Sequence, residues 1–504
     1  MIQAARPAGQ RDSKIQKPEY KLKRPGKIIR VTRERKSMRE KLATLPLAQL
    51  KELAKSQGLK GTSTMKKAEL IELLANEAEK QEETKSTEAA NAEEQGEAGK
   101  HSQHQAHSQH GAKPEGEEGE AYPEDKEDLD SGIVANGILE VMSDGYGFIR
   151  CENYLPGEND VYVAPSQIRR FGLKTGDIVV GNTRVRTGNE KFSALLYVKS
   201  INGMHPSETA TRYNFEDMTP IFPNERIHLE MGNNNIAMRI MDLISPIGKG
   251  QRGMIVSPPK AGKTTLLKAV AKAVTRANPE MHLIILLIDE RPEEVTDIKE
   301  SIQGSNVEVI YSTFDELPEH HKRVSEMVIE RARRLVESRR DVMILLDSIT
   351  RLSRAYNLTV PPSGRTLSGG LDPAALHMPK RFFGAARNMR EGGSLTILAT
   401  ALVDTGSKMD DVVYEEFKGT GNMEMVLDRK LQEKRVFPAI DLAKSSTRRD
   451  DLLLAPMELE AIDIVRKAFN SMKPEDATDK LIDLFSRTRS NREFIDMVKK
   501  IRFY

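Results

Sequence analysis

Between residues 203 and 504, short and nearly continuous apolar runs alternate with longer segments of helical periodicity. The apolar runs read GMIVS, HLIILLID, VEVIYST, DVMILLD and SLTILATAL. Strands that are apolar on both faces are typical of a parallel sheet that helices cover on both sides. The pattern therefore predicts one large α/β domain over residues 203–504.

Residues 132–202 follow a different pattern, in which short alternating runs of polar and apolar residues are separated by Gly, Asn and Asp. Runs of this kind, with turn residues between them, predict a small barrel of about five strands. The barrel would precede the α/β domain in the chain.

Aromatic residues recur within the predicted barrel. Tyr146 and Phe148 alternate with glycines, so both rings lie on the same face of one strand, and Arg150 continues that face. Tyr162 and Phe192 lie on later strands. The rings could fill the barrel core, but their glycine neighbours favour an exposed face on which unpaired bases stack. We therefore expect the barrel to bind RNA or single-stranded DNA.

Residues 38–78 place leucines near a helical period. Gly58 can end one helix, and Ser63 or Thr64 can cap a second helix. Two such helices bury little surface by themselves, so we expect a small helical subdomain that packs on a neighbour.

Two further segments lack the composition of a packed domain. Residues 1–37 are strongly basic, which fits a solvated arm or a loose attraction to nucleic acid or acidic proteins. Residues 79–131 are acidic and polar, so burial cannot offset the entropy of ordering, and we expect a disordered linker. Its histidines recur at every third position, which fits a metal or pH-sensing site or, more simply, a low-complexity insert. These histidines are His101, His104, His107 and His110.

The overall composition excludes several classes of protein. The chain has 504 residues, of which 38% are hydrophobic and 30% charged, as in a globular protein with some disordered segments. It has no apolar run of membrane-spanning length, and its first residues lack the apolar stretch of a secretory signal. A single cysteine, Cys151, excludes an internal disulfide framework. We therefore expect a cytoplasmic protein with no membrane partner.

The sequence SPPKAGKTT, residues 257–265, lies between the strand GMIVS and a predicted helix. In this context Gly-Lys-Thr forms a phosphate site, because backbone N–H groups and the helix dipole point at the anion. Lys263 would contact the β- and γ-phosphates of ATP, and the Thr264 hydroxyl would bind Mg²⁺. Ser257 replaces the usual first glycine but is also small. The expected ATP-binding loop residues are Pro259, Lys260, Ala261, Gly262, Lys263, Thr264 and Thr265.

Carboxylates follow two of the predicted strands. Asp347 ends DVMILLD, where an aspartate orients Mg²⁺ or its water. Glu290 ends LIILLIDE, at the edge where open sheets bind ligands, and is the candidate that orients or activates the attacking water. Asp289, Glu293 and Glu294 compete for this role, and each could equally be a surface charge or an ion-pair partner.

Several long segments occur in an order that resembles the Rho family of bacterial transcription termination factors. In the α/β domain they include PPKAGKTT, LLIDERPEEVTD, ILLDSITRLSRAYN, LDPAALHMPKRFFGAARN, TALVDTGSKMDDVVYEEFKGTGN and EKRVFPAIDLAKSSTRR. In the barrel they are DGYGFIR, DVYVAPSQIRRF and FSALL. The resemblance covers about residues 38–78 and 132–490. It leaves out the basic arm and the acidic, histidine-containing linker.

The resemblance implies a multidomain fold. It consists of a small N-terminal helical subdomain, an OB-fold barrel of the cold-shock type, and a C-terminal RecA-like α/β P-loop ATPase domain. The resemblance also implies a homohexamer that hydrolyses ATP with Mg²⁺ in response to RNA. Such a hexamer is a 5′-to-3′ RNA–DNA helicase that captures single-stranded C-rich RNA and releases it from RNA polymerase.

The resemblance also implies roles for matching residues of this chain. It implies a primary RNA site on the barrel, formed by Tyr146, Phe148, Arg150, Tyr162, Glu190 and Phe192. It implies two pore loops that pull RNA, formed by Thr366, Leu367, Ser368, Gly369, Gly370 and Lys408. Ser368 stands where the family has threonine, so a hydroxyl group is kept at this position. Arg365 stands where the family has lysine, so a positive charge is kept there.

In the ATP site the resemblance implies an arginine finger, Arg448, which a neighbouring subunit supplies. Without the resemblance Arg448 would be interpreted as a solvated charge. Arg291 and Arg351 become charged residues of the site, and Phe437 becomes the ring that stacks on adenine. The implied catalytic residues are Lys263, Glu290, Arg291 and Arg448.

Three alternative functions would use a similar ATPase core or nucleic-acid-binding barrel. A DNA strand-exchange ATPase would form filaments on single-stranded DNA. A rotary ATP-synthase-like subunit would hydrolyse ATP without regard to RNA and would pair with a second homologous chain. A non-catalytic scaffold would bind RNA without turnover.

Overall fold

The computed structural model describes residues 129–188, 190–209, 212–232 and 235–501. All of them belong to one unit of the chain, residues 119–504. The predicted basic arm, the predicted helical subdomain and the histidines of the acidic segment lie outside the described residues. No helix in the described part combines the length and the apolar character needed to cross a membrane.

The first described domain is a closed five-stranded barrel in the order β1-β2-β3-β5-β4. Its fully buried core residues include Leu139, Ile149, Val163 and Val179. This architecture confirms the predicted OB-fold. The elements are β1 (Asp130–Val141), β2 (Gly147–Arg150), β3 (Val161–Val163), α5 (Pro165–Phe171), β4 (Ile178–Arg184) and β5 (Ser193–Ile201). Since β1 begins at Asp130, the first strand starts within the segment 79–131, which was expected to be a linker.

Short elements connect the barrel to the α/β domain. They are α6 (Pro206–Thr209), the 3-10 turn η1 (Phe215–Asp217) and β6 (Pro220–Ile221).

The α/β domain is built on a sheet in the order β14-β13-β7-β12-β10-β8-β9. Each of the five predicted apolar runs forms one of its strands, and neighbouring strands from β13 to β9 are parallel. The strands are β7 (Arg252–Ser257), β8 (His282–Glu290), β9 (Val307–Thr313), β10 (Asp341–Asp347), β12 (Ser394–Leu402), β13 (Met423–Val426) and β14 (Ser446–Thr447). A short strand, β11 (Arg387–Met389), pairs with β12 and β6.

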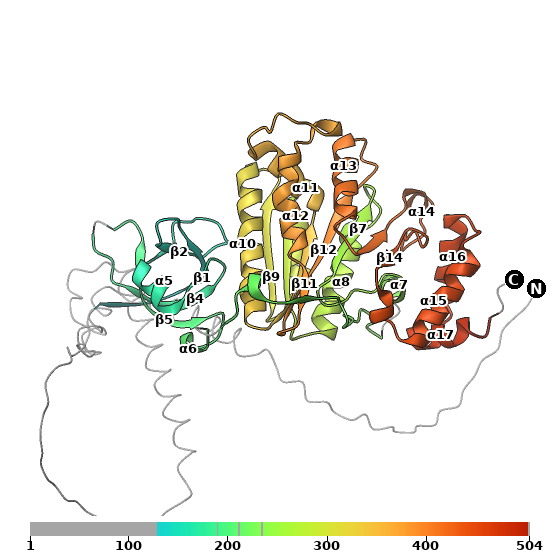
Figure 1. Ribbon diagram of the computed structural model, residues 1–504, viewed down its shortest axis with the longest axis horizontal. Coiled ribbons are helices and arrows are strands. Elements are labelled where there is room, and N and C mark those ends of the chain that lie inside the picture. The colour runs from blue at the N-terminus through green and yellow to red at the C-terminus, as the bar shows by residue number, and fades with distance from the viewer. Residues whose placement is uncertain (1–128, 189, 210–211, 233–234, 502–504) are drawn as a thin grey trace, which may run out of the picture. The chain divides into compact units, whose positions relative to one another are not determined.

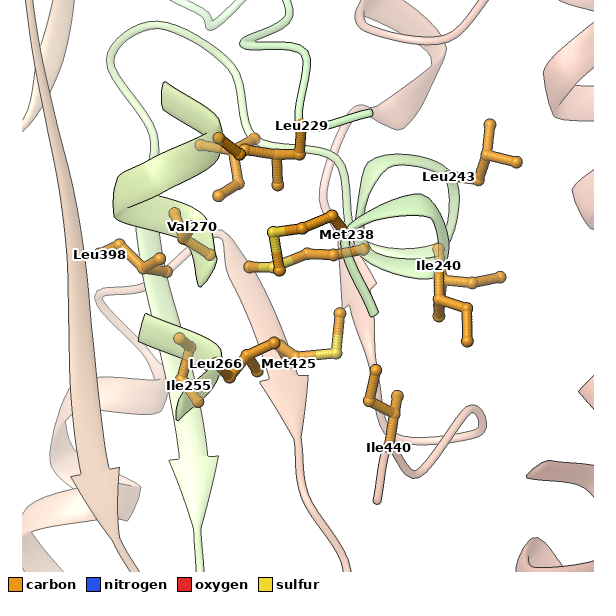
Figure 2. Packing of buried hydrophobic residues seen from close by; sticks show 14 of the residues in the cluster. Leu229, Met238, Ile240, Leu243, Ile255, Leu266, Val270, Leu398, Met425 and Ile440 are labelled. Atoms are coloured by element: carbon orange, nitrogen blue, oxygen red, sulfur yellow. The ribbon is translucent and has the colours of Figure 1, made fainter. Parts of the chain in front are cut away.

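Helices cover both faces of this sheet, as the apolar strands predict. Along β10, Met343 and Leu345 enter one core, while Val342 and Ile344 enter the other. Figure 2 shows part of the first core, where Met238 and Val270 from two helices gather near Ile255 of β7 and Met425 of β13. The helices that contribute to this first core include α7 (Ile236–Ile244), α8 (Lys263–Ala277) and α9 (Pro292–Ser301).

The second core lies under α10 (Pro318–Glu337), α11 (Ile349–Thr359), α12 (His377–Gly384) and α13 (Lys408–Lys418). Figure 1 shows the last three helices lying together near the end of the chain. These are α15 (Pro456–Phe469), α16 (Pro474–Ser486) and α17 (Asn491–Val498). The remaining short elements are η2 (Ser368–Gly370), η3 (Pro373–Leu376), α14 (Arg429–Glu433) and η4 (Asp450–Leu452).

Candidate functional site

The loop between β7 and α8 has the strand–loop–helix geometry that the sequence predicts. Strand β7 ends at Ser257 and α8 begins at Lys263. Gly262 precedes the helix with φ of 93°, a left-handed conformation that glycine adopts without strain. The unpaired N–H groups of the first helical turn, together with the helix dipole, make this end of α8 a site for an anion.

Lys263 lies between two carboxylates at the carboxyl ends of the sheet strands. Its Nζ forms an ion pair with Asp347 and lies 3.9 Å from Oε2 of Glu290. The buried Asp347 also accepts a hydrogen bond of 2.8 Å from the Thr400 hydroxyl on Oδ1. The other oxygen, Oδ2, is buried and accepts no hydrogen bond from the described residues. A buried carboxylate oxygen without a partner is a place for a bound cation or its water.

Glu290 is buried at the end of β8, and only 4% of it is exposed. Burial raises the pKa of Glu290 above that of an ordinary glutamate, and the charge of Asp347 raises it further. Lys263 and Arg351 lower the pKa, but they offset this effect only in part. A buried carboxylate with a raised pKa beside a phosphate loop is suited to accept a proton from water.

The three competing carboxylates have other partners or positions. Asp289 forms an ion pair with Arg351, with a separation of 3.1 Å. Glu294 lies 3.5 Å from the Thr264 hydroxyl and 3.8 Å from Arg291. Glu293 is exposed on the first turn of α9. Among these carboxylates, Glu290 is therefore the buried one that faces Lys263.

A cavity of about 620 Å³ opens beside the loop. Its lining is mostly apolar, and the ring of Phe437 stands at it with 55% of the residue exposed. An apolar cavity with an exposed aromatic ring fits a flat heterocyclic base. The sequence did not predict that Asn235 and Ile236, at the start of α7, would line this cavity. This helix precedes β7 in the chain, and no nucleotide-binding motif marks the two residues.

Arg448 lies far from the nucleotide loop of its own chain. It directly follows the edge strand β14, and its backbone N–H donates to the carbonyl of Asn422 at 2.8 Å. Asn422 is followed in the chain by Met423, which pairs with Gly253 near the start of β7. The nucleotide loop follows the other end of β7. Since each strand residue advances about 3.3 Å, the exposed Arg448 stands at the opposite end of this strand from Lys263.

The aromatic residues of the barrel form one cluster on its surface. The Phe148 ring centroid lies 5.9 Å from that of Tyr146, 6.0 Å from that of Tyr162 and 5.1 Å from that of Phe192. All four rings are partly exposed, and none belongs to the barrel core. Lys191 places its ammonium group 5.2 Å from the Phe192 ring. Rings and a cation arranged in this way form a stacking surface for unpaired bases.

Two charged residues expected on this surface are already paired within the protein. Arg150 lies on the aromatic face, 4.9 Å from the centre of the Phe148 ring. It is buried, however, and forms ion pairs with Glu140 and Asp160. The hydrogen bond from the Thr187 backbone N–H, helped by Arg184, lowers the pKa of Glu190 below its usual range. We call the rings of Tyr146, Phe148, Tyr162 and Phe192 the aromatic platform.

The two expected pore loops are in contact with each other. Gly369 has φ of 79°, and a Cβ atom there would lie 2.4 Å from the backbone nitrogen of Met409. Gly369 therefore lets the first loop pack against the start of α13, which begins with the exposed Lys408. Most of the first loop is exposed, at Thr366, Ser368, Gly369 and Gly370, while Leu367 is partly buried.

Helix α11 carries residues that hold both loops and that sequence reasoning missed. Arg354 donates two hydrogen bonds of 2.8 and 2.7 Å to Asp410 on α13. Asn357 donates to the carbonyl of Gly370 at 3.3 Å. The partners are 56 and 13 residues apart in the chain, so no periodic signal links them.

The fold and the sites together define a P-loop ATPase that carries a nucleic-acid-binding barrel. The comparisons with known families agree with this class. Residues 135–207 match the RNA-binding domain of Rho termination factor, and residues 41–82 match its N-terminal domain. Residues 237–447 match the nucleotide-binding domain of the ATP synthase alpha/beta family.

Curated relatives identify the family. The chain is 56% identical over 373 residues to transcription termination factor Rho of Pseudomonas aeruginosa. The aligned region covers 73% of this chain and 88% of that protein. It is 54% identical over 377 residues to Rho of Bacillus subtilis, and this aligned region covers 75% of this chain and 86% of that protein. The chain belongs to the Rho family of transcription termination factors. It is an ATP-hydrolysing enzyme with an RNA-binding domain, and its ATPase activity depends on RNA.

Solved structures are similar to part of the chain. An ATPase from the type III secretion system of pathogenic bacteria matches 56% of this chain and 86% of its own, with 21% identity and a TM-score of 0.47. An ATP synthase subunit, NeqB from Nanoarcheaum equitans, matches 56% of this chain and 77% of its own, with 20% identity and a TM-score of 0.44.

Proposed function

We propose that the protein is a homohexameric 5′-to-3′ RNA translocase and RNA–DNA helicase. It captures single-stranded C-rich RNA and releases the transcript from RNA polymerase, which places it in the cytoplasm. The position of Arg448 supports the hexamer most strongly, because this residue is remote from the nucleotide loop of its own chain. A pocket that uses Lys263 from one protomer and Arg448 from the next requires a head-to-tail contact, which a ring closes.

The nucleotide in this proposal is ATP bound with Mg²⁺. Thr264 and Asp347 are the residues proposed to hold the ion, and the unpartnered Oδ2 of Asp347 fits this role. In this proposal the ion takes its other ligands from phosphate and water. When bound, Mg²⁺ neutralises charge on the β- and γ-phosphates. The proposed ATP contacts are Pro259, Lys260, Ala261, Gly262, Lys263, Thr264, Thr265, Arg351 and Phe437.

In the proposed mechanism Glu290 accepts the proton of the attacking water. Its raised pKa makes it a stronger base than an ordinary glutamate. Lys263 exchanges its ion pair with Asp347 for the γ-phosphate, and Arg448 of the neighbouring protomer stabilises the charge that develops there. Arg291 is proposed as a further cation at the edge of the site, since its side chain is exposed and only weakly tied to Glu294.

The RNA path in this proposal has two parts. The aromatic platform stacks bases, together with Arg150 and Glu190. The pore loops then pull the strand, through Lys408 and through the glycines of η2, which let backbone approach phosphate. Gly369 packs on the start of α13, so we expect the two loops to move together. The proposed pore residues are Thr366, Leu367, Ser368, Gly369, Gly370 and Lys408.

Replacing Phe148 with alanine tests the platform. The ring contacts three others, and loss of one stacked base weakens binding by about 1–3 kcal/mol, or roughly five- to 150-fold in Kd. Fluorescence anisotropy with a labelled C-rich RNA measures this change. Tyr197→Ala is the matched control, because Tyr197 is an exposed barrel aromatic outside the platform. Equal losses in both variants, or no loss in Phe148→Ala, would contradict the platform.

Replacing Lys263 with alanine tests the nucleotide pocket. The variant removes a preorganised cation at the phosphates, which lowers kcat by about 10²–10³-fold. RNA binding to the barrel remains. Steady-state ATP hydrolysis with RNA present measures the loss, and Lys268→Ala on the same helix, where Lys268 pairs with Asp297, is the control. Unchanged turnover in Lys263→Ala would refute the pocket. RNA binding without turnover in the wild type would instead favour a non-catalytic scaffold.

A further inference from the structure

A residue of the ATPase domain reaches the RNA-binding face of the barrel. Arg323, on α10, donates hydrogen bonds of 2.7 Å to both carboxylate oxygens of Glu140 on β1. Glu140 also accepts a hydrogen bond of 2.7 Å from Nε of Arg150, which in turn pairs with Asp160. We call Glu140, Arg150, Asp160 and Arg323 the Glu140 cluster.

This cluster adjoins the aromatic platform. Glu140 is the direct cross-strand partner of Phe148 in the β1–β2 pair, so their side chains lie on the same face of the barrel. The guanidinium of Arg150 lies 4.9 Å from the Phe148 ring. Anything that moves Glu140 or Arg150 therefore acts on the ring that is proposed to stack a base.

The charge of the cluster balances only when Arg323 is included. Within the barrel, two carboxylates face a single guanidinium, which leaves one net negative charge beside the platform. Glu140 is largely buried, with 17% of its side chain exposed, so water screens this charge only in part. RNA phosphates approaching the platform would be repelled by it. Arg323 supplies the missing positive charge from α10.

Other contacts hold the barrel against the ATPase domain close to this point. The side chain of Asn153 donates to the Tyr311 carbonyl at 2.7 Å and accepts from the Tyr311 N–H at 3.1 Å. Asn202 accepts a hydrogen bond of 2.6 Å from Arg331, which is also on α10. These bonds hold β9 and α10 beside the barrel independently of Arg323.

We propose that Arg323 is a positioning residue for RNA capture, which balances the charge of the Glu140 cluster and thereby fixes Arg150 and the Phe148 ring. The proposal rests on the proposed role of Phe148 in stacking RNA. In this proposal the aromatic platform is held in its RNA-binding arrangement only when the ATPase domain contributes the side chain of Arg323.

The test measures the affinity of the full-length protein for a labelled C-rich RNA, without ATP and at moderate salt. Arg323→Ala is expected to raise Kd by roughly three- to tenfold, as for loss of a partly buried ion pair. Arg323→Lys, which keeps the charge, should stay within about twofold of the wild type. Arg323→Ala combined with Glu140→Gln should recover most of the loss, because the second change removes the unpaired negative charge.

Lys174→Ala is the matched control, since Lys174 joins the barrel to Glu337 of α10 but lies outside the cluster. It should leave RNA affinity unchanged. If Arg323→Ala binds RNA as well as the wild type while Phe148→Ala does not, this inference is wrong and the platform stands. If the combined variant is as weak as Arg323→Ala alone, the effect is general loosening and the inference is also wrong. If Phe148→Ala has no effect, the proposed function itself fails.

Discussion

Replacing Arg448 with alanine is expected to lower kcat for RNA-stimulated ATP hydrolysis by about 10³–10⁵-fold, the contribution of an arginine finger. ATP and RNA binding should persist, because Lys263, Phe437 and the aromatic platform are untouched. The size of the effect follows from chemistry: a guanidinium near the transferring phosphoryl group stabilises charge that is larger in the transition state than in the ground state.

Mixing the Arg448→Ala variant with wild-type protein tests whether the arginine acts on a neighbour. If each pocket uses the next protomer's Arg448, one altered subunit disables the pocket of its neighbour, and activity falls faster than the fraction of wild type. Arg449→Ala is the control, since Arg449 is the adjacent exposed arginine but is tied to Asp451 at 2.9 Å. A strictly proportional loss with Arg448→Ala would contradict catalysis between protomers.

Glu290→Gln is expected to lower kcat by about 10²–10⁴-fold while ATP still binds, because glutamine cannot accept the proton of the attacking water. The pKa of Glu290 is raised by burial and by Asp347. The wild-type rate should therefore fall with decreasing pH already above the ordinary glutamate value of about 4.3. A rate profile measured at saturating ATP and RNA reports this fall.

The same pKa shift predicts the effect on stability. Folding raises the pKa of Glu290, so the ionised side chain destabilises the folded state at pH values above that raised pKa. This destabilisation disappears as the pH falls and Glu290 becomes protonated. Glu290→Gln should therefore not lower Tm at neutral pH. The exposed Glu293→Gln and the ion-paired Asp289→Asn are the controls, and both should retain most activity. Loss of activity in one of these instead of Glu290→Gln would reassign the base.

The sequence predicts those parts of the fold that depend on local pattern. The apolar runs are all strands of the sheet, and the alternating runs form the barrel. The loop before Lys263 and the carboxylates that end β8 and β10 follow from the same pattern, because ligands meet the carboxyl ends of parallel strands. These features need only neighbouring residues and strand direction.

The remaining features depend on partners that are distant in the chain. Arg448 gives no local signal, because its proposed target lies in another protomer, and only the resemblance identified it. Arg150 was expected on an exposed face, yet it is buried because Glu140 and Asp160 neutralise it. Arg323 and Glu140 are 183 residues apart, so neither periodicity nor composition could connect them.

The most direct test of the central claim is the rate of ATP hydrolysis by the purified full-length protein with and without polycytidylate. We predict slow hydrolysis by the protein alone and strong stimulation by the RNA, because RNA in the proposed pore would bring Arg448 of one protomer to the pocket of the next. Equally fast hydrolysis in the presence and absence of RNA would contradict it.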